Sequence, residues 1–435
     1  MKVIQAPYTF YPDPVGGTEV YVEKLAQKLF ELNVESVIAA PHRKSNDSYA
    51  YGGMRVHRYH VGEVRHLREL YGEGCSEAAK KFGLLLDNEK PTVLHLHAWS
   101  RAVSIKVVRE AKKRNIPVIF TYHTAPVTCA RGSLLQWGEK VCDGKLGVQK
   151  CSGCVLHSLG LSRFAAMILA SLPANFGNVA QQLKLSGRVW TALRMRELIE
   201  FQQKNIIDFF QEVDHIVAVS EWSKQLLIEN GVPQGKITFC RHGIEATAVT
   251  PPTLSALPPL KIVFMGRFHP LKGLSILLEA IHDEPSLEVE LHIYGITEDS
   301  TSESYEHQLK TRFLTDRRMV FHEAVPHPEV QSVLKNFHVM AIPSQALETG
   351  PMVLLEALSV GLPVIASDLG GIAEIVSRGA GGILVEPSSK KAWRSALYRC
   401  VEDPAVLRGL RAKIPQIKKM SVLAQEIFDL YRRYQ

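Results

Sequence analysis

The chain has 435 residues, of which 46% are hydrophobic and 22% charged, so it can bury a substantial core in two or three domains. This composition excludes a mainly disordered, collagen-like or coiled-coil protein. The formal net charge of +7 favours anionic ligands or a membrane surface and is too small to predict nucleic-acid binding. The chain enters strand-like sequence directly and shows no uninterrupted apolar run of membrane-spanning length, which predicts a cytoplasmic protein.

Short runs rich in β-branched residues alternate with amphipathic helical stretches over most of the chain. In the first half, strands are predicted at 3–10, 34–40, 91–98 and 117–124, with helices at 19–32 and 104–114. In the second half, strands are predicted at 261–268, 287–295, 318–325, 338–344 and 363–368, with helices at 274–281, 327–336 and 350–361. This alternation is typical of parallel sheets joined by right-handed helical crossovers, so the predicted fold class is α/β.

A segment with four prolines and no charge separates the two halves and is typical of a linker. Before it, the alternation breaks at a loop rich in cysteine and glycine, which is followed by a long helical region. Insertions of this kind in an α/β domain are usually functional or interfacial. The predicted organisation is an N-terminal domain at 1–250 with the Cys-rich loop at 129–154 and the helical insertion at 155–212, a linker at 246–260, a C-terminal domain at 261–418, and a terminal helix at 419–435.

The helical insertion contains apolar residues at helical spacing, which favours a core stripe. The alternative is a face for a membrane or a lipid-linked substrate, supported by the nearby Arg163 and Lys184. The apolar positions are Phe164, Met167, Ile168 and Leu172.

Gly16 and Gly17 follow the first predicted strand and open a helix. Glycine lets the backbone approach a ligand closely, and the N–H groups of a first helical turn attract anions. The pattern indicates a phosphate or sugar cradle, with an ordinary strand-to-helix turn as the alternative.

Arg267 and Lys272 lie at the end of the first strand of the second half, in the stretch Gly266–Gly273. Ligands of open α/β sheets bind at the carboxyl ends of the strands. An arginine fork and a mobile lysine five residues apart can converge on a diphosphate. The alternative is a pair of solvated surface cations.

Glu348 and Glu356 are eight residues apart across a predicted loop-to-helix junction. Pro351 suits the first helical turn, which puts Glu348 before the helix and Glu356 inside it. Glu356 has apolar neighbours on nearly all sides, so its carboxylate should have a partner. Phosphate would be cradled by the helix-terminal amides while the carboxylates accept hydrogen bonds from hydroxyl groups. The predicted binding segment also includes Thr349, Gly350, Pro351, Met352 and Val353.

Four cysteines with the spacing C-x12-C-x8-C-x2-C occupy the Gly-rich loop. The C-x2-C end is a good half-site for tetrahedral zinc, although the first pair is unusually spaced. Structural zinc, disulfides and unliganded thiols are the alternatives for Cys129, Cys142, Cys151 and Cys154, whereas Cys75, Cys240 and Cys400 are predicted to be core thiols.

Taken together, these motifs resemble those of a family 4 glycosyltransferase of the GT-B fold, and the resemblance covers essentially the whole chain. A Cys-bearing loop is also found in some bacterial members of that family. The matching pieces, in order, are the glycines at 16–17, Tyr-His-Thr at 122–124, Val-Ser-Glu at 219–221, the stretch 266–273, the two glutamates of 348–356, and the stretch 363–376.

The resemblance implies two Rossmann-like domains facing each other across a cleft, and transfer of a sugar with retention from a UDP- or GDP-linked donor. By position, Arg267 and Lys272 would bind the donor diphosphate, Glu356 the ribose, and Glu348 the donor sugar. His123 would face the donor sugar near the reacting centre. Gly16 and Gly17 would approach the phosphate or the acceptor.

The sequence contains no Asp-x-Asp metal motif, which predicts catalysis without a metal cofactor, the cations at 267 and 272 taking its role. The acceptor would be a glycan, a lipid-linked sugar or a small molecule, with peripheral association at the inner membrane face and no nucleic-acid partner. The alternatives are a nucleotide-sugar epimerase or glycan phosphorylase of the same architecture, and a non-catalytic glycan-binding or assembly subunit.

Overall fold

The computed structural model describes residues 1–42, 46–173, 187–245, 257–376 and 381–435. The chain divides into two units, each with its own sheet. Unit 1 comprises Met1–Arg241 and Ser421–Gln435, and unit 2 comprises His242–Met420. Most of the expected linker, at 246–256, lies outside the described residues.

Unit 1 is built on an eight-stranded sheet with the order β10-β9-β6-β5-β1-β2-β4-β3. All neighbouring strands are parallel except the edge strand β3, which runs antiparallel to β4. The bounds are β1 (Lys2–Ala6), β2 (Glu35–His42), β3 (Asp47–Tyr51), β4 (Met54–His60), β5 (Val93–Leu96), β6 (Val118–Tyr122), β9 (His215–Ala218) and β10 (Ile237–Phe239).

Helices connect these parallel strands, as the crossover pattern predicts. The first helix begins at Gly17, because the Glu19 side chain accepts a hydrogen bond from the Gly16 N–H, and it buries Val22, Leu25 and Leu29 against the sheet. The helices around this sheet are α1 (Gly17–Glu31), α2 (Ser76–Glu89), α3 (Ile105–Lys112), α8 (Glu221–Glu229) and the C-terminal α16 (Met420–Arg432).

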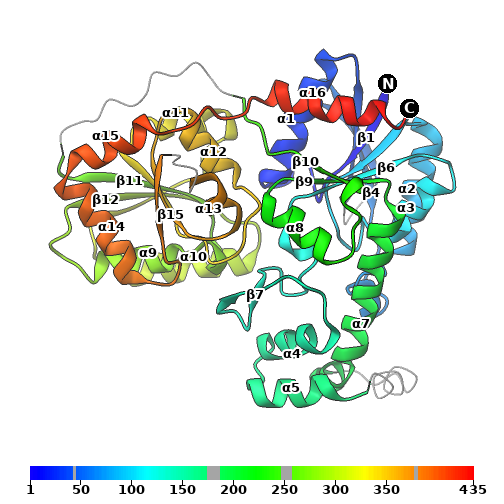
Figure 1. Ribbon diagram of the computed structural model, residues 1–435, viewed down its shortest axis with the longest axis horizontal. Coiled ribbons are helices and arrows are strands. Elements are labelled where there is room, and N and C mark those ends of the chain that lie inside the picture. The colour runs from blue at the N-terminus through cyan, green and yellow to red at the C-terminus, as the bar shows by residue number, and fades with distance from the viewer. Residues whose placement is uncertain (43–45, 174–186, 246–256, 377–380) are drawn as a thin grey trace. The chain divides into compact units, whose positions relative to one another are not determined.

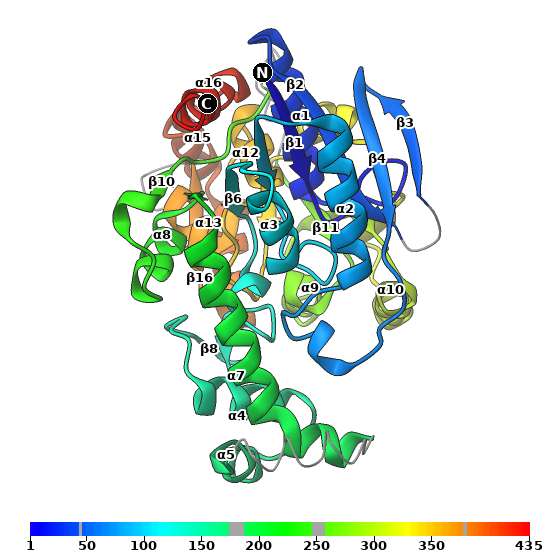
Figure 2. The same cartoon turned by 90° about the vertical axis from the view of Figure 1, so that its right-hand side faces the viewer.

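A lobe projects from this sheet along one long helix, as Figures 1 and 2 show. The lobe consists of the Cys-rich loop, two short helices and the first half of the long helix. Its own small core is formed by residues that include Leu156, Ala166, Ala170, Met195 and Ile199. The elements are β7 (Leu135–Gln136), β8 (Lys140–Val141), α4 (Val148–Ser158), α5 (Arg163–Ser171) and α7 (Arg188–Glu212).

The prediction of a core stripe in this insertion was wrong for two of its four residues. Phe164 is 78% exposed and Ile168 is 50% exposed. The inward face of α5 carries Ala166 and Ala170 instead, which are fully buried, because small side chains allow its close packing in the lobe. In the described part of the chain, no helix is both long and apolar enough to cross a membrane.

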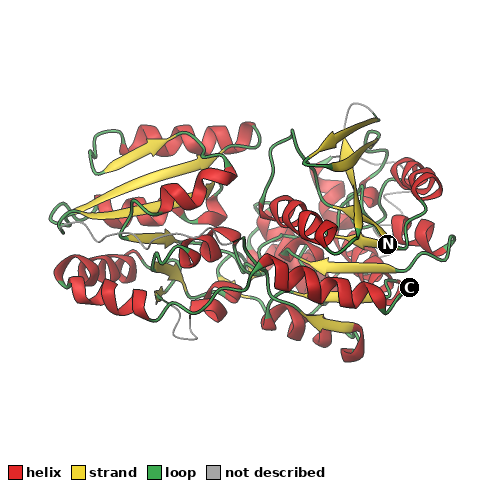
Figure 3. Ribbon diagram, turned by 90° about the horizontal axis from the view of Figure 1, so that it is seen from above, coloured by secondary structure: helices red, strands yellow, loops and turns green. Residues whose placement is uncertain are grey.

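Unit 2 has a six-stranded, all-parallel sheet with the order β13-β12-β11-β14-β15-β16. Figure 3 shows helices on both faces of its strands. The strands are β11 (Leu260–Arg267), β12 (Val289–Ile296), β13 (Met319–His322), β14 (Val339–Ile342), β15 (Val364–Ser367) and β16 (Gly382–Val385); the helices are α9 (Leu274–His282), α10 (Ser300–Phe313), α11 (Val330–Leu334), α12 (Met352–Ser359), α13 (Gly370–Val376), α14 (Lys390–Glu402) and α15 (Pro404–Ala412).

The period-2 alternation of β11 separates the two cores of this unit. Ile262 and Phe264 pack with Leu277 and Trp393 on one face of the sheet, whereas Val263 packs with Leu354 on the other. Both faces of the strand are therefore buried, as in other parallel sheets. The carboxyl end of the strand is left to carry polar side chains.

Candidate active site

The charged residues predicted for unit 2 meet where β11 and β14 end. Lys272 follows β11 in a short 3-10 turn, Pro270–Lys272, and its Nζ donates to Glu348 Oε2 at 2.8 Å. Ser344, just after β14, donates its hydroxyl to the other carboxylate oxygen of Glu348. Arg267 is the last residue of β11 and pairs with Glu298 Oε2 at 3.1 Å.

Glu348 is ionised in this setting. Burial raises the pKa of its carboxyl, but the Lys272 ammonium, the Ser344 hydroxyl and the more distant Arg267 outweigh burial and lower the pKa below its ordinary value. The sequence predicted these two cations and this carboxylate separately. The structure brings them to one edge of the sheet, and it adds Ser344, which carried no motif signal.

Helix α12 begins directly after this cluster. Pro351 lies one residue before the helix, with an extended ψ of 131°, so the predicted place in the first turn is off by one residue. Met352 and Val353 open the helix, and the adjacent Thr349 is buried. The first backbone N–H groups of α12 therefore point toward the loop that holds Glu348, which is an anion-attracting position.

Glu356 lies in the fifth position of α12 and is only 4% exposed. The expected partner of its carboxylate is supplied by His327, whose Nε2 lies 2.8 Å from Glu356 Oε1. His327 belongs to a turn ahead of α11, and the sequence analysis did not select it. Because His327 is partly exposed, it can move away, and the Glu356 carboxylate can then accept a hydrogen bond from a ligand hydroxyl in its place.

Two glycines hold the backbone of this site in place. A Cβ at Gly273, which has a φ of +70°, would lie 1.8 Å from the Pro343 carbonyl oxygen. A Cβ at Gly371 would lie 2.2 Å from the Thr349 carbonyl oxygen, and the Gly371 N–H donates to the Glu348 carbonyl at 2.7 Å. Only glycine permits these close backbone approaches. His242 adds a contact to the Gly350 carbonyl oxygen at 3.2 Å.

In unit 1, the predicted glycine cradle is occupied by a side chain of its own helix. The Gly16 N–H donates to Glu19 Oε2 at 3.0 Å, and burial raises the pKa of the Glu19 carboxyl. The first-turn amide that sequence analysis assigned to a phosphate or sugar thus already has an acceptor. Gly17, the first residue of α1, lies beside it.

His123 follows β6 and is buried at the end of a chain of polar side chains under the sheet edge. Its Nε2 lies 3.1 Å from His97 Nδ1, and its ring packs against Tyr21 at a centroid distance of 4.8 Å. The remaining links join His97 Nε2 to Gln5 Oε1 at 2.7 Å, Gln5 Nε2 to the Tyr431 hydroxyl at 3.2 Å, the Tyr431 hydroxyl to His95 Nδ1 at 2.6 Å, and His95 Nε2 to Thr121 Oγ1 at 2.7 Å.

This chain of hydrogen bonds has one consistent direction. Burial lowers the pKa of His95 to about 3, so its ring is neutral and Nδ1 accepts the Tyr431 hydroxyl proton. Tyr431 accepts from the Gln5 amide, whose oxygen then accepts from His97 Nε2–H. His97 Nδ1 then accepts a proton carried by His123 Nε2.

The Cys-rich loop contains no disulfide; all seven cysteines of the chain lie within the described residues as thiols. Cys154 Sγ accepts from the Trp137 N–H at 3.2 Å. In the described ranges, no group of three or more His, Cys, Asp or Glu side chains is placed to hold a metal ion. Zinc binding by the four thiols stays a prediction. The predicted core thiols Cys75, Cys240 and Cys400 are buried, as expected.

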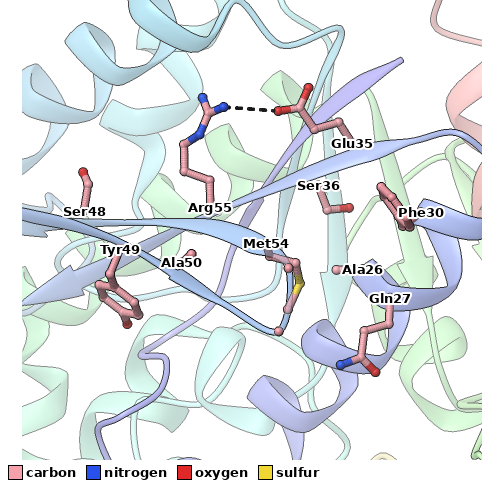
Figure 4. A pocket seen from close by; sticks show the side chains of 12 residues that line it. Ala26, Gln27, Phe30, Glu35, Ser36, Ser48, Tyr49, Ala50, Met54 and Arg55 are labelled. Carbon is pink, nitrogen blue, oxygen red and sulfur yellow. Dashed lines mark ion pairs between the residues drawn. The ribbon is translucent and has the colours of Figure 1, made fainter.

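A cavity of about 560 Å³ lies elsewhere in unit 1, between the second half of α1 and the β3–β4 hairpin. Figure 4 shows its lining, which includes Phe30, Met54 and the ion pair of Arg55 with Glu35 at 3.7 Å. These residues lie toward the end of α1, whereas the candidate site lies at its beginning. The cavity is therefore separate from the polar clusters described above.

Two family models match the chain, one in each unit. Residues 15–143 match the description "Glycosyltransferase Family 4", and residues 251–419 match "Glycosyl transferases group 1". The two matched ranges together contain every predicted catalytic residue. The sequence and the fold thus define the class of GT-B glycosyltransferases. The chain belongs to glycosyltransferase family 4.

Curated relatives agree with this assignment over part of their length. The chain is 26% identical to the amylovoran biosynthesis glycosyltransferase AmsK of Erwinia amylovora over 253 residues, which are 55% of this chain and 61% of the relative. It is 29% identical to a D-inositol 3-phosphate glycosyltransferase of Rhodococcus opacus over 220 residues, or 47% and 49%. These matches span about half to three fifths of the relatives.

Solved structures match over the full length. The sucrose-phosphate synthase of Thermosynechococcus elongatus aligns with a TM-score of 0.67 at 18% identity, covering 100% of this chain and 99% of that one. Anabaena HepE, solved in complex with UDP and glucose, aligns with a TM-score of 0.65 at 15% identity, covering 99% of both. At these identities the likeness concerns the fold, and the predicted GT-B architecture of two Rossmann-like domains is confirmed.

Proposed function

We propose that this protein is a retaining glycosyltransferase that transfers a sugar from a nucleotide-sugar donor, UDP- or GDP-linked, to a hydroxyl acceptor. The observation that carries the proposal is the cluster of Lys272, Glu348 and Arg267 at the carboxyl ends of β11 and β14. A partly buried, ionised carboxylate beside two cations at the start of a helix suits a ligand that combines a diphosphate with sugar hydroxyls.

Departure of the nucleotide places negative charge on the donor diphosphate while the sugar becomes oxocarbenium-like. Arg267 is half-exposed and can turn its guanidinium from Glu298 to a phosphate, because an exposed ion pair holds it only weakly. Lys272 is held in place by Glu348 before any ligand binds. Its charge is therefore preorganised for the leaving group, which is how charge stabilisation lowers a barrier most effectively.

The other roles follow the same geometry. Glu356, which contacts His327, would accept hydrogen bonds from the ribose hydroxyls. Glu348 would contact the donor sugar with a carboxylate that stays ionised. His123 would face the donor sugar near the reacting centre, with its Nε2 held by His97 Nδ1.

The names of the relatives support the substrate class. AmsK is described as an enzyme of amylovoran biosynthesis, and HepE was solved with UDP-glucose. We assign this chain a donor of the same chemical class, a glycan, lipid-linked or small-molecule acceptor, and catalysis without a metal cofactor. A place at the inner face of the membrane belongs to the same proposal.

The test is donor hydrolysis and thermal shift with a panel of UDP- and GDP-sugars, each with and without EDTA. One donor should raise the melting temperature and be hydrolysed slowly, with no change on adding EDTA. Loss of hydrolysis in EDTA would reject metal-independent catalysis and leave the transferase class intact. No binding by any donor would reject the proposal and favour a non-catalytic glycan-binding subunit, and conversion of the donor to its epimer without an acceptor would assign the epimerase.

A further inference from the structure

The lobe of unit 1 is rigidly connected to the sheet but shares little of its core. Helix α7 has 25 residues and is therefore about 37 Å long. Its second half is anchored by Phe209, which packs on Trp99 and Phe120 at centroid distances of 4.5 and 5.0 Å. Its first half packs on α4 and α5. Both Figure 1 and Figure 2 place α5 and the first turn of α7 at the end of the lobe farthest from the sheet.

The outer end of the lobe exposes large apolar side chains. On α5, Phe164 and Ile168 are one turn apart and point away from the buried Ala166 and Ala170, so among the described residues the larger apolar face of the helix is the exposed one. We call the following set the apolar tip: Leu159, Phe164, Ile168, Val189 and Trp190, which are 63%, 78%, 50%, 69% and 37% exposed.

The charge of the chain is concentrated in the same region. Residues 144–196 contain seven lysines and arginines and no aspartate or glutamate, whereas the remainder holds 44 basic and 44 acidic residues. In sequence, this segment's charge equals the formal net charge of +7. In the structure, Lys150 pairs with Asp143 and Arg194 with Glu197, which flank the segment, and Lys184 lies outside the described residues. Arg163 lies directly beside Phe164, where it pairs with the exposed Glu139 and lies over the Trp137 ring at 5.8 Å from its centroid; water or another anion can replace the exposed ion pair.

We propose that the apolar tip docks on the surface of a bilayer containing anionic lipids. Exposed aliphatic and aromatic side chains enter the boundary between headgroups and acyl chains, and basic residues around them attract the negative surface. A second copy of the chain is the less favourable occupant, because two copies of this basic segment would repel each other. Docking deepens the proposed function by placing the enzyme where a lipid-linked acceptor is presented, but it is independent of the sugar-transfer chemistry.

The test is flotation of the full-length protein with vesicles of phosphatidylcholine alone or of equal parts phosphatidylglycerol and phosphatidylcholine. Wild type should float with the anionic vesicles, and much less with neutral vesicles or in high salt. The double variant Phe164→Ser/Ile168→Ser should bind anionic vesicles at least 10-fold more weakly. The matched control is Phe30→Ser, because Phe30 is 75% exposed on α1, outside the lobe, and its replacement should not change binding.

Trp190 provides a second readout. Its fluorescence should shift to the blue on adding anionic vesicles, and the shift should be lost in Trp190→Phe. Equal flotation of wild type and double variant would overturn the proposal, as would absence of binding to both vesicles. A dimer in light scattering that the double variant abolishes would assign the tip to self-association instead. Donor hydrolysis in vesicle-free solution should be the same in wild type and double variant, so failure of docking is distinguishable from failure of the proposed function.

Discussion

Unit 1 and unit 2 treat polar groups in opposite ways at the ends of their strands. In unit 2, Lys272 forms an ion pair with Glu348, and Arg267 forms one with Glu298. In unit 1, His95 and its neighbours form a neutral chain in which each donor has one acceptor. The comparison indicates a division of labour: the charged cluster suits a ligand that gains charge during reaction, whereas the neutral chain can only orient a hydrogen-bonding group.

The largest expected effect concerns the charged cluster. Lys272→Ala should lower kcat/KM by about 100- to 1,000-fold, because it removes a preorganised cation from the leaving group and leaves Glu348 buried without its partner. The measurement is steady-state transfer or donor hydrolysis, with circular dichroism to confirm folding. Lys310→Ala is the matched control, because Lys310 forms a similar ion pair with Glu306 on α10 and should retain wild-type rates. Near-normal activity of Lys272→Ala would show that Lys272 is a surface cation with no role in catalysis.

The second-largest expected effect concerns the affinity of unit 2 for the nucleotide. Glu356→Ala should weaken nucleotide binding by about 1.5–3 kcal/mol, since hydrogen bonds from ligand hydroxyls to a charged acceptor are lost. Isothermal titration with the free nucleoside diphosphate measures it directly. His327→Ala removes the partner and leaves the carboxylate, so its affinity should fall much less. If both variants bind alike, Glu356 has a structural role only.

The charged cluster was more predictable from sequence than the neutral chain, because its residues lie next to patterns that can be recognised locally in the sequence. Arg267 and Lys272 lie at the end of a recognisable strand, so the rule that ligands bind at the carboxyl ends of parallel strands selected them. Glu348 was selected together with Glu356 by their spacing across a loop-to-helix junction. The neutral chain joins Gln5 in β1 to Tyr431 in α16, more than 400 residues apart, which no local pattern reveals.

The predictions for the outer parts of unit 1 failed for other reasons. The strands β3 and β4 were not predicted, because β3 is an exposed edge strand with a polar sequence and β4, although mostly buried between β2 and β3, is rich in arginine and histidine. Helical periodicity identified apolar residues in α5 but could not tell that Ala166 and Ala170 would form the packed face. The side of a helix that packs depends on its neighbours, so Phe164 and Ile168 were assigned to the core when they lie outside it.

A smaller effect is expected from the neutral chain, where His97 acts as a positioning residue for His123. His97→Phe fills the same space but cannot accept the His123 Nε2 proton, so kcat should fall about 10-fold while the KM for the donor changes little. His215→Phe is the matched control, because His215 is also buried and bonded to a threonine and a tyrosine, Thr238 and Tyr434, without reaching His123. An equal loss in both variants would indicate a general packing defect.

The last effect concerns stability and not activity: the stability of unit 1 should depend on pH. The pKa of His95 is about 3 in the folded protein and about 6.5 in an unfolded chain, so the unfolded state binds more protons as the pH falls. Stability is therefore intact above pH 6.5 and decreases between pH 6.5 and 3, by about 2–3 kcal/mol at pH 4.5. His95→Gln has no such proton to take up, so its urea midpoint should fall less between pH 7 and 4.5 than that of wild type. His242, whose pKa burial lowers to about 4, remains in both proteins and cancels in the comparison. An identical loss in wild type and variant would show that His95 does not stay neutral, and the direction assigned to the chain ending at His123 would then lose its basis.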